Sequence, residues 1–323
     1  RDSYLRFIKG LVDTQDIDLN VSREMLQNNP AVAKISKSLV GKILRELKKV
    51  SEKNADGYKS FWKEYGAVLK EGLYEDAERK EALLDLCRFS TNENDDPISL
   101  SEYVEKMPEK QKDIYYISAE TKDQALASPH LEGFKSKKIP VLIMTDAIDQ
   151  FWLPMVGSFK EKKFTSITQG QINLDDLDEK NKDKKKDDKN EKEKKDKEYV
   201  DLVAQLKVVL GDQVKDIRLS SKLTDSPVCL VADEGDMDIA MEQLMAQRDT
   251  NYKGAPRILE INGDHSLIKN MKSLLSKKEN NDLVSDAGTL LFEQARLMEG
   301  KMPADPAQFS KIMNQFLLKA IPN

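Results

Sequence analysis

The sequence predicts a helix-rich mixed α/β protein, and three observations support this fold class. Apolar residues recur at helical spacing from about residue 31 to residue 89. Strand and helix patterns alternate from residue 113 to beyond residue 146. After a densely charged stretch, short strands and then long helices fill residues 199–321. We therefore expect two mixed α/β regions separated by the charged stretch.

The composition limits the class of protein. The 323 residues are enough for two domains, and 34% of them are charged, above the ~25% of an average globular protein. A formal net charge of -5 argues against a nucleic-acid binder and gives no reason to expect a membrane surface. No apolar run approaches the ~20 residues of a membrane span. Two distant cysteines, Cys87 and Cys229, favour buried thiols in a reducing, cytoplasmic setting.

The first third of the chain is predicted to be mainly helical. Residues 4–13 predict a strand running into a turn at Gly10, and Ser22 is a candidate cap for a short helical turn. Three apolar stripes at helical spacing follow. Their members are Val32, Ile35, Leu39, Val40, Ile43, Leu44 and Leu47; then Tyr58, Phe61, Trp62, Tyr65, Val68 and Leu69; then Ala82, Leu83, Leu86 and Phe89.

A small αβα layer is predicted next. Residues 113–118 form a strand pattern, and residues 121–127 a short helix with Thr121 as its cap. Residues 139–144 form a buried strand pattern, and a helix follows from Asp146. Two strands joined through a helix predict parallel pairing.

Residues 175–198 are almost entirely Lys, Asp and Glu. Such a segment has too little apolar surface to offset the entropy lost on ordering, which favours a flexible linker. A solvated single helix held by acid–base pairs is the alternative. Either structure separates two domains.

The second region has a regular series of elements. A helix ends at Gly211, and strands are predicted at residues 214–219, 227–231 and 257–261. The helices are predicted at residues 237–247, 265–275, 283–298 and 306–321. His265 is a candidate helix cap, and neither histidine has partners at the spacing of a zinc site.

Two apolar surfaces are candidates for binding partners. Met237, Met241, Leu244 and Met245 share one helix face, while Phe151 and Trp152 lie close together with Leu153 and Met155. A row of Met residues on one helix face most often lies in the protein core. The flexible Met side chains also suit a surface that repacks around varied partners. The faces of the last two helices pack either on their own domain or on a second copy of the chain.

Several strings resemble the heat-shock protein 90 chaperone family, in particular its bacterial type. Tyr4-Leu5-Arg6-Phe7-Ile8-Lys9-Gly10 and Leu19-Asn20-Val21-Ser22-Arg23-Glu24-Met25-Leu26-Gln27 look like the catalytic-loop region of its middle domain. Phe61-Trp62-Lys63-Glu64-Tyr65-Gly66 is similar to its helical coil, and Ser128-Pro129-His130 to its small αβα subdomain. Leu223-Thr224-Asp225-Ser226-Pro227 and Leu259-Glu260-Ile261-Asn262-Gly263-Asp264-His265 resemble its C-terminal domain.

The resemblance implies a domain plan. Residues 1–174 are the middle-domain portion, with the catalytic loop at 14–30, the helical coil at 31–92 and the αβα subdomain at 93–174. Residues 175–198 are the charged linker, and residues 199–323 form the C-terminal dimerisation domain. Because the sequence opens with Arg rather than Met, we expect a longer parent protein. The resemblance implies that this parent also carries an N-terminal ATP-binding domain.

The resemblance also implies a reaction. Arg23, assisted by Gln27, contacts the γ-phosphate of ATP held with Mg²⁺ by the N-terminal domain of the full-length protein, which is an ATPase. A guanidinium suits that role because it is always charged and forks onto phosphate oxygens. No Gly-rich phosphate loop is found in these residues, so we expect this chain alone to bind no nucleotide and to be catalytically silent.

By the same resemblance, the chain binds unfolded client proteins and forms a homodimer, with co-chaperones as further partners. The residues expected to contact clients are Phe151, Trp152, Met237, Met241, Leu244 and Met245. Those expected at the dimer interface are Leu283, Leu290, Leu291, Met298, Phe309, Ile312, Met313, Phe316 and Leu317. The alternative is a non-enzymatic dimeric scaffold or adaptor with helical docking surfaces.

Overall fold

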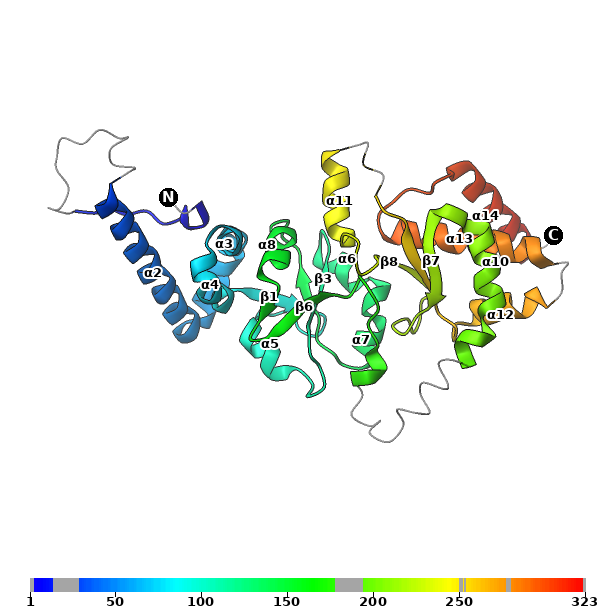
Figure 1. Cartoon of the computed structure of the whole chain (residues 1–323), viewed down its shortest axis with the longest axis horizontal. Helices are drawn as coiled ribbons and strands as arrows, with labels where there is room; N and C mark the ends of the chain where they lie inside the picture. Colours follow the sequence, from blue (N-terminus) through cyan, green and yellow to red (C-terminus); the bar gives the residue numbers. More distant parts are fainter. Residues whose placement is uncertain are drawn as a thin grey trace. The chain divides into compact units, whose positions relative to one another are not determined.

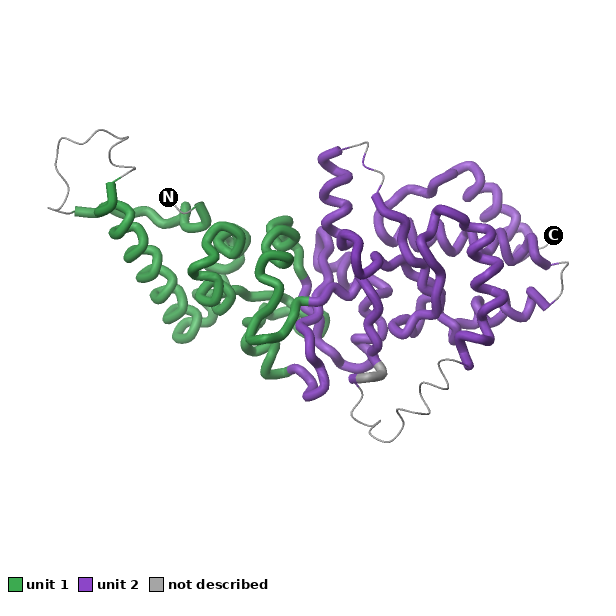
Figure 2. The backbone as a smooth tube through the Cα atoms, in the orientation of Figure 1, with its two compact units in different colours: residues 1–106, 144–164 green, residues 107–143, 165–323 purple. Residues whose placement is uncertain are grey.

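The computed structural model describes residues 3–13, 29–177, 194–249, 252, 254–276 and 280–321. The chain separates into two compact units, which Figure 2 shows in green and purple. Unit 1 comprises Arg1–Lys106 and Met144–Phe164, and unit 2 comprises Met107–Ile143 and Thr165–Asn323. Helices and strands occur in both units, which confirms the predicted helix-rich mixed α/β class (Figure 1).

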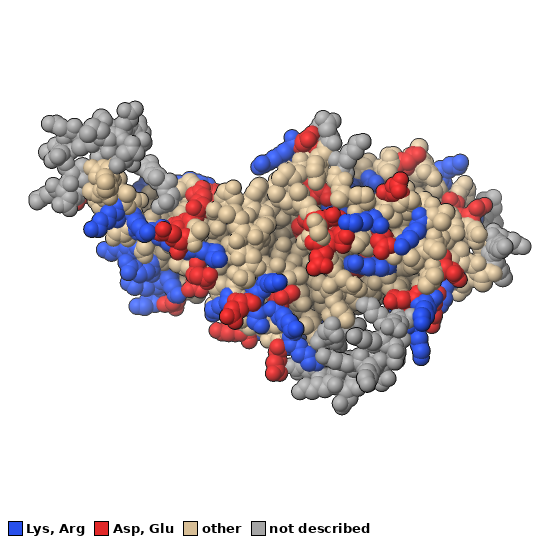
Figure 3. All heavy atoms as spheres, in the orientation of Figure 1, with Lys and Arg blue, Asp and Glu red and all other residues tan. Residues whose placement is uncertain are grey.

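Unit 1 contains the long helices that the apolar stripes predicted. α2 spans Pro30–Lys53, and the Asn29 side chain caps it, with proline favoured at this first helical position. α3 follows at Ala55–Glu75 with Asn54 as its cap, and α4 spans Lys80–Leu86. Lys and Arg side chains gather on the exposed side of α2, in keeping with a solvated helix face (Figure 3).

The other elements of unit 1 are short. They are η1 Ser3–Leu5, η2 Ala77–Arg79, β1 Arg88–Thr91, β2 Ile98–Ser99, α5 Leu100–Lys106, α8 Asp149–Val156, β5 Ser158–Phe159 and β6 Lys162–Ser166, whose last residues belong to unit 2. β1 pairs antiparallel with β2, and β5 pairs antiparallel with β6.

The strand predicted over residues 4–13 is wrong. Ser3–Leu5 form a 3-10 helix, and residues 3–13 contain no strand. Tyr4 is buried against α3, where its ring would lie 2.8 Å from a Cβ added at Gly72, and its hydroxyl donates to Asp76 Oδ2 at 2.7 Å. The apolar residues here therefore pack individually onto a helix, which a strand-like pattern does not reveal.

The placement of Phe89 on the third helical stripe is also wrong. α4 ends at Leu86, and Phe89 lies in β1, where buried and half-buried residues alternate. Phe89 is buried as predicted, but on a strand face. Phe89 follows Leu86 by three positions, so it fits helical spacing although the helix has already ended.

Unit 1 encloses a buried ion pair. Lys70 Nζ, from α3, donates to both carboxylate oxygens of Asp149, on α8, at 2.7 and 2.9 Å. Trp152 Nε1 also donates to Asp149, and the Asp146 carboxylate lies 2.6 Å from Lys70 Nζ. Burial lowers the pKa of Lys70, but the two carboxylates outweigh burial and raise this pKa above its ordinary value. The ammonium group is therefore charged and paired inside the unit.

Unit 2 begins with the αβα elements. β3 spans Ile114–Ser118 and lies next to β4, Leu142–Met144, which is shorter than the strand predicted at residues 139–144. The intervening helices are α6 Lys122–Leu126, η3 Pro129–Leu131 and α7 Glu132–Ser136, and η4 Leu174–Leu177 follows later in the chain. Thr121 caps α6 by accepting from the Gln124 N–H, as predicted.

The remaining elements of unit 2 agree closely with the prediction. They are α10 Val200–Leu210, η6 Gly211–Gln213, β7 Val214–Leu219, β8 Val228–Val231, α11 Ile239–Arg248, β9 Arg257–Ile261, α12 Ser266–Leu275, α13 Asn281–Met298 and α14 Pro306–Ala320. α10 ends at Gly211, and His265 caps α12 by accepting from the Leu267 N–H through Nδ1 at 3.1 Å. Both of these signals are confirmed.

A three-stranded sheet organises this part of unit 2. Its strand order is β7-β9-β8, with β9 parallel to β7 and antiparallel to β8. Every residue of β9 is buried, as expected for a central strand. Leu259 and Ile261 join the apolar core formed with α10, α12 and α13. A separate core is formed by β3, α6, α7 and β4.

The domain boundaries predicted at residues 174 and 199 stay a prediction. Residues 178–193 lie outside the described residues, so the form of the charged segment is not assigned. Residues 194–198 are helical and lead toward α10. Cys87 and Cys229 are free and buried, as predicted.

We predict that Lys70→Met lowers the free energy of unfolding by about 3–5 kcal/mol, because it leaves the Asp149 carboxylate buried without its cation. Urea unfolding followed by tryptophan fluorescence measures this change. The double variant Lys70→Met/Asp149→Leu is expected to recover most of the loss. Lys48→Met is the control, because it breaks the exposed Lys48–Asp85 pair and costs at most ~1 kcal/mol. Equal losses for the Lys70 and Lys48 variants would contradict the prediction.

Candidate functional site

α11 carries three of the four apolar residues that the sequence singled out in the second region, Met241, Leu244 and Met245. The prediction that the helix begins at Met237 is wrong, because α11 begins at Ile239 and Met237 precedes its cap. Asp238 caps the helix by accepting from the Ala240 N–H at 2.9 Å. Met237 is 40% exposed, and Met241, Leu244 and Met245 are half-buried. We call these four residues the Met face. In Figure 1 the helix (yellow) projects from the rest of unit 2.

The other side of α11 is held mainly by polar contacts. Within this helix, which is described throughout, only Ile239 and Glu242 are buried. Glu242 Oε2 lies 2.6 Å from Arg257 Nη2, and both side chains are 4% exposed. The Gln243 amide donates to the Glu299 carbonyl oxygen at 2.7 Å. These contacts fasten the inner side of the helix to its own chain, and the Met face remains partly exposed.

A cavity of about 610 Å³ lies along this inner side. It is lined by Glu242, Gln243 and Ala246 of α11, by residues 254–257 and by residues 299–301. Gly254 has a φ of 68°, and a Cβ there would lie 2.0 Å from Glu242 Oε1, so the close approach of the carboxylate requires glycine. Because space is left below α11, few apolar contacts fix its position.

A second buried carboxylate, that of Glu299, borders the cavity. Neither of its oxygens has a hydrogen-bond partner, although Lys301 Nζ lies 3.4 Å from Oε2. Burial raises the pKa of Glu299, and the charges of Lys301 and Arg257 offset this only in part. The polar network under α11 is therefore incompletely satisfied, which makes the position of the helix sensitive to the groups that do bind it.

The other predicted contact residues lie on α8 in unit 1. Phe151 is half-buried and packs edge-on against Tyr74, with ring centroids 6.5 Å apart. Met155 is 59% exposed and was left out of the predicted set. Trp152 is fully buried between Phe89 and Phe164, so in this structure it supports α8 and offers no surface to a partner.

The residues predicted for association divide into three groups by burial. Leu291 and Ile312 are buried inside their own chain. Four are half-buried, namely Leu283, Leu290, Phe309 and Phe316, and Phe316 packs against the core of unit 2. Met298, Met313 and Leu317 are exposed. The inner side of these helices thus belongs to the chain's own core, and the outer side is free.

The outer side of α14 carries an exposed apolar stripe. Met313, Leu317, Leu318 and Ile321 are 40%, 50%, 74% and 73% exposed. We call these four residues the α14 stripe, of which Leu318 and Ile321 were not predicted. A contiguous exposed apolar stripe marks a surface that binds a partner.

Arg23 and Gln27 lie outside the described residues. Among the residues that the structure does describe, no group of His, Cys, Asp and Glu is placed to hold a metal ion. Within the same residues, no helix is long and apolar enough to cross a membrane.

Sequence reasoning missed the polar residues that hold α11. Glu242 follows Ile239 by three positions, so helical spacing alone places both on the inner side. Nothing in the sequence shows that this carboxylate meets Arg257, because their pairing depends on how β9 packs against α11. Asp is a residue type that often caps helices, so the capping role of Asp238 was predictable. Its contact with the hydroxyls of Ser166 and Thr168 was not.

Comparison with known proteins gives a family for these features. A family model described as Hsp90 protein matches residues 2–322. Chaperone protein HtpG of Roseobacter denitrificans is 44% identical over 321 residues, covering 99% of this chain and 51% of that protein. The proteins of the same name from Paramagnetospirillum magneticum and Streptomyces coelicolor are 43% and 39% identical, and 51% and 48% of their lengths are covered.

The chain thus spans about half the length of these relatives. The match of the family model extends over nearly all of the chain, and it includes the helix-rich unit 1 as well as the sheet and terminal helices of unit 2. The chain belongs to the Hsp90 family of molecular chaperones.

Proposed function

We propose that this chain is the part of an ATP-dependent chaperone that binds unfolded client proteins, forms the homodimer and supplies an arginine to ATP hydrolysis. The single observation that carries the proposal is the Met face. Met241, Leu244 and Met245 lie on α11, and Met237 lies just before its cap, while Glu242 of the same helix pairs with Arg257.

Client binding follows from the chemistry of the Met face. Unfolded proteins expose varied apolar side chains, and flexible, polarizable Met side chains adapt to many shapes. The half-buried Phe151 and the exposed Met155 offer a second apolar surface on α8. We assign client contact to Phe151, Met237, Met241, Leu244 and Met245, with Trp152 supporting Phe151 from inside the unit.

Dimerisation follows from the α14 stripe. α14 buries Ile312 toward its own core and leaves its opposite side apolar and exposed. A second copy of the chain covers such a stripe with the same residues in a twofold arrangement. Met298 at the end of α13, and Met313 and Leu317 on α14, are the exposed members of the predicted interface.

The role of Arg23 and Gln27 rests on the family. In the whole protein, ATP with Mg²⁺ is held outside this chain, and Arg23 neutralises the charge that develops on the γ-phosphate. Gln27 follows Arg23 by four positions in the sequence and assists it.

We predict that Arg23→Ala in the full-length protein lowers ATP turnover by at least about tenfold. An arginine that stabilises the transferred phosphoryl group can raise kcat by ~10³ or more, so its removal slows the reaction. Steady-state phosphate release measures turnover, and thermal unfolding is expected to be unchanged. Lys34→Ala, which removes an exposed charge on α2, is the control and is expected to keep full turnover. Undiminished turnover of the Arg23 variant would exclude its catalytic role and favour the scaffold alternative.

We predict that Leu317→Asp converts the dimer to a monomer, because a carboxylate buried in an apolar interface lacks a partner. Light scattering at micromolar concentration gives the mass. Leu317 is 50% exposed, so the change leaves the chain's own core intact. Val208→Asp, at an 80% exposed position on α10, is the matched control. A wild-type mass of one chain would rule out dimerisation, and an unchanged Leu317→Asp dimer would place the interface elsewhere.

We predict that Met237→Glu weakens binding of a fluorescently labelled unfolded protein roughly three- to tenfold, since about 1 kcal/mol of apolar contact is lost. Fluorescence anisotropy measures the Kd. Leu267→Glu is a close control, because Leu267 is 39% exposed, as against 40% for Met237, and lies on α12. Equal affinities of the two variants would remove the Met face from the client site.

A further inference from the structure

One carboxylate joins α11 to a segment of the chain about seventy residues earlier. Asp238 Oδ1 caps the helix, accepting from the Ala240 N–H at 2.9 Å. Asp238 Oδ2 accepts from the hydroxyls of Ser166 and of Thr168, the latter at 3.0 Å. Ser166 and Thr168 are 4% and 7% exposed. The start of the helix is thus tied to two buried side chains.

Residues 166–172, which we call the strap, also hold the loop that leads into α11. The Thr168 carbonyl oxygen accepts from the Ala232 N–H at 3.0 Å, and the Gly170 N–H donates to the Ala232 carbonyl oxygen at 2.8 Å. The Gln169 amide donates to the carbonyl oxygen of Asp236 at 2.6 Å, and lies 3.3 Å from the carbonyl oxygens of Asp233 and Glu234. The strap therefore fixes the loop from Ala232 to Asp238.

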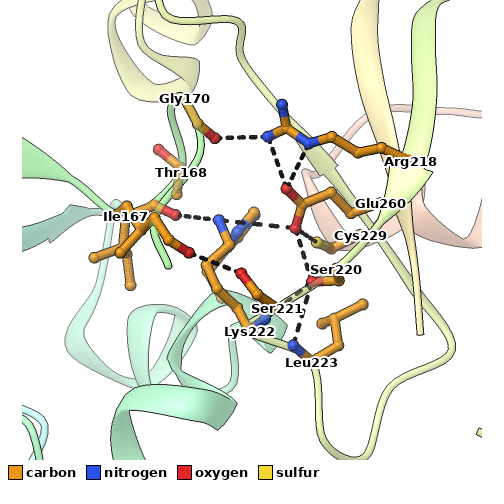
Figure 4. A network of polar contacts seen from close by, with 12 residues as sticks. Ile167, Thr168, Gly170, Arg218, Ser220, Ser221, Lys222, Leu223, Cys229 and Glu260 are labelled. Atoms are coloured by element: carbon orange, nitrogen blue, oxygen red, sulfur yellow. Dashed lines mark hydrogen bonds and ion pairs between the residues drawn. The ribbon is translucent and has the colours of Figure 1, made fainter. Parts of the chain in front are cut away.

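The strap is itself held firmly. Figure 4 shows Arg218, which donates to the Gly170 carbonyl oxygen at 2.7 Å and to Glu260 Oε1 at 2.8 Å. The buried Lys222 ammonium donates to the Ile167 carbonyl oxygen at 2.9 Å. Side chains from β7 and from the loop after it thus bind the strap's carbonyl groups. A segment bound on both sides is a rigid platform for what it carries.

Ser166 also connects the platform to β3. Ser166 and Asp238 both lie near the Tyr116 hydroxyl of β3 and affect its pKa. Burial raises the pKa of Tyr116, and the negative charge of Asp238 adds to this effect, so the phenol keeps its proton. A run of neutral hydroxyl groups thus leads from β3 to the Asp238 carboxylate. Charge-assisted hydrogen bonds of this kind are stronger than those between neutral groups.

The direction of α11 depends on few other contacts. Only Ile239 and Glu242 are buried in it, and the cavity of about 610 Å³ lies on its inner side. Its remaining anchors include the Glu242–Arg257 pair and the bond from Gln243 to Glu299. Because this set is small, we expect the loss of one anchor to change the orientation of the helix.

We propose that Ser166, Thr168 and Gln169 are positioning residues of the client surface, which act through Asp238 and its loop to set the direction of α11. They touch no client themselves. They determine where the Met face is presented. The proposal deepens the client-binding function proposed above and rests on it.

The test compares two changes on the same stretch of chain. Ser166→Ala/Thr168→Val removes the hydroxyls that hold Asp238 and leaves its helix cap in place. Thr165→Val is the matched control, because Thr165 Oγ1 donates to Asp113 Oδ2 at 3.0 Å and not to the α11 loop. Each variant is combined with Ala246→Cys for a spin label on α11, since the native Cys87 and Cys229 are buried. Label mobility, amide exchange of α11 and affinity for an unfolded protein are measured.

We expect the double variant to speed amide exchange in α11 by about tenfold, to increase label mobility and to weaken client affinity about threefold or more. The Thr165 variant is expected to leave all three unchanged. Asp238→Asn keeps a good helix cap, so it is expected to disturb α11 less than Asp238→Ala. If the double variant does not fold, Thr168→Val alone replaces it.

Equal label mobility in the double variant and the Thr165 control would overturn the proposal, because a purely structural role predicts equal effects. This readout needs no client. A wild-type chain that fails to bind unfolded protein would therefore reject the proposed function, while label mobility and amide exchange still decide whether the strap positions α11.

Discussion

The need to pair buried charges is the constraint on which much of this structure depends. A carboxylate removed from water is tolerated where a cation or several hydrogen-bond donors meet it. Asp149 meets Lys70 in unit 1, and Glu260 meets Arg218 in unit 2, each pair joining segments that are far apart in the sequence. Such pairs contribute little net stability. They do specify which segments lie together, because a wrong pairing leaves a charge unsatisfied.

In unit 2 the same constraint has a consequence for function. The polar groups Asp238, Glu242 and Gln243 connect α11 to its own chain, and the Met face remains partly exposed. A helix fastened by an apolar face would have to give up that face to its own core. When polar contacts attach a helix to its own chain, its apolar residues are left to bind another protein. This attachment also makes the helix responsive, because hydrogen bonds are directional and each one fixes an angle.

Much of the fold was predictable from the sequence, and the reason lies in local signals. β7 and β9 begin and end at the predicted residues, and Thr121, Gly211 and His265 act at helix ends as expected. These signals depend on neighbours within a few residues. The failures at Tyr4 and Phe89 arose where burial against a distant helix or strand decided the structure. The strap also depends on contacts between distant parts of the chain. Ser166 and Thr168 look like ordinary strand residues in the sequence, and only the fold brings them to Asp238.

The candidate sites divide in the same way. Helical spacing identified the Met face and the faces of α13 and α14, because an amphipathic pattern is visible in one dimension. It did not show which side of α14 its own chain covers. The structure places Ile312 inside and Leu317 outside, although both are apolar and belong to one helix. The own-domain and second-copy alternatives are therefore compatible. One side of α14 completes the core of unit 2, and this packing holds the other side rigid as a preformed stripe. In the dimer that we propose, such a preformed stripe reduces the entropy lost on binding.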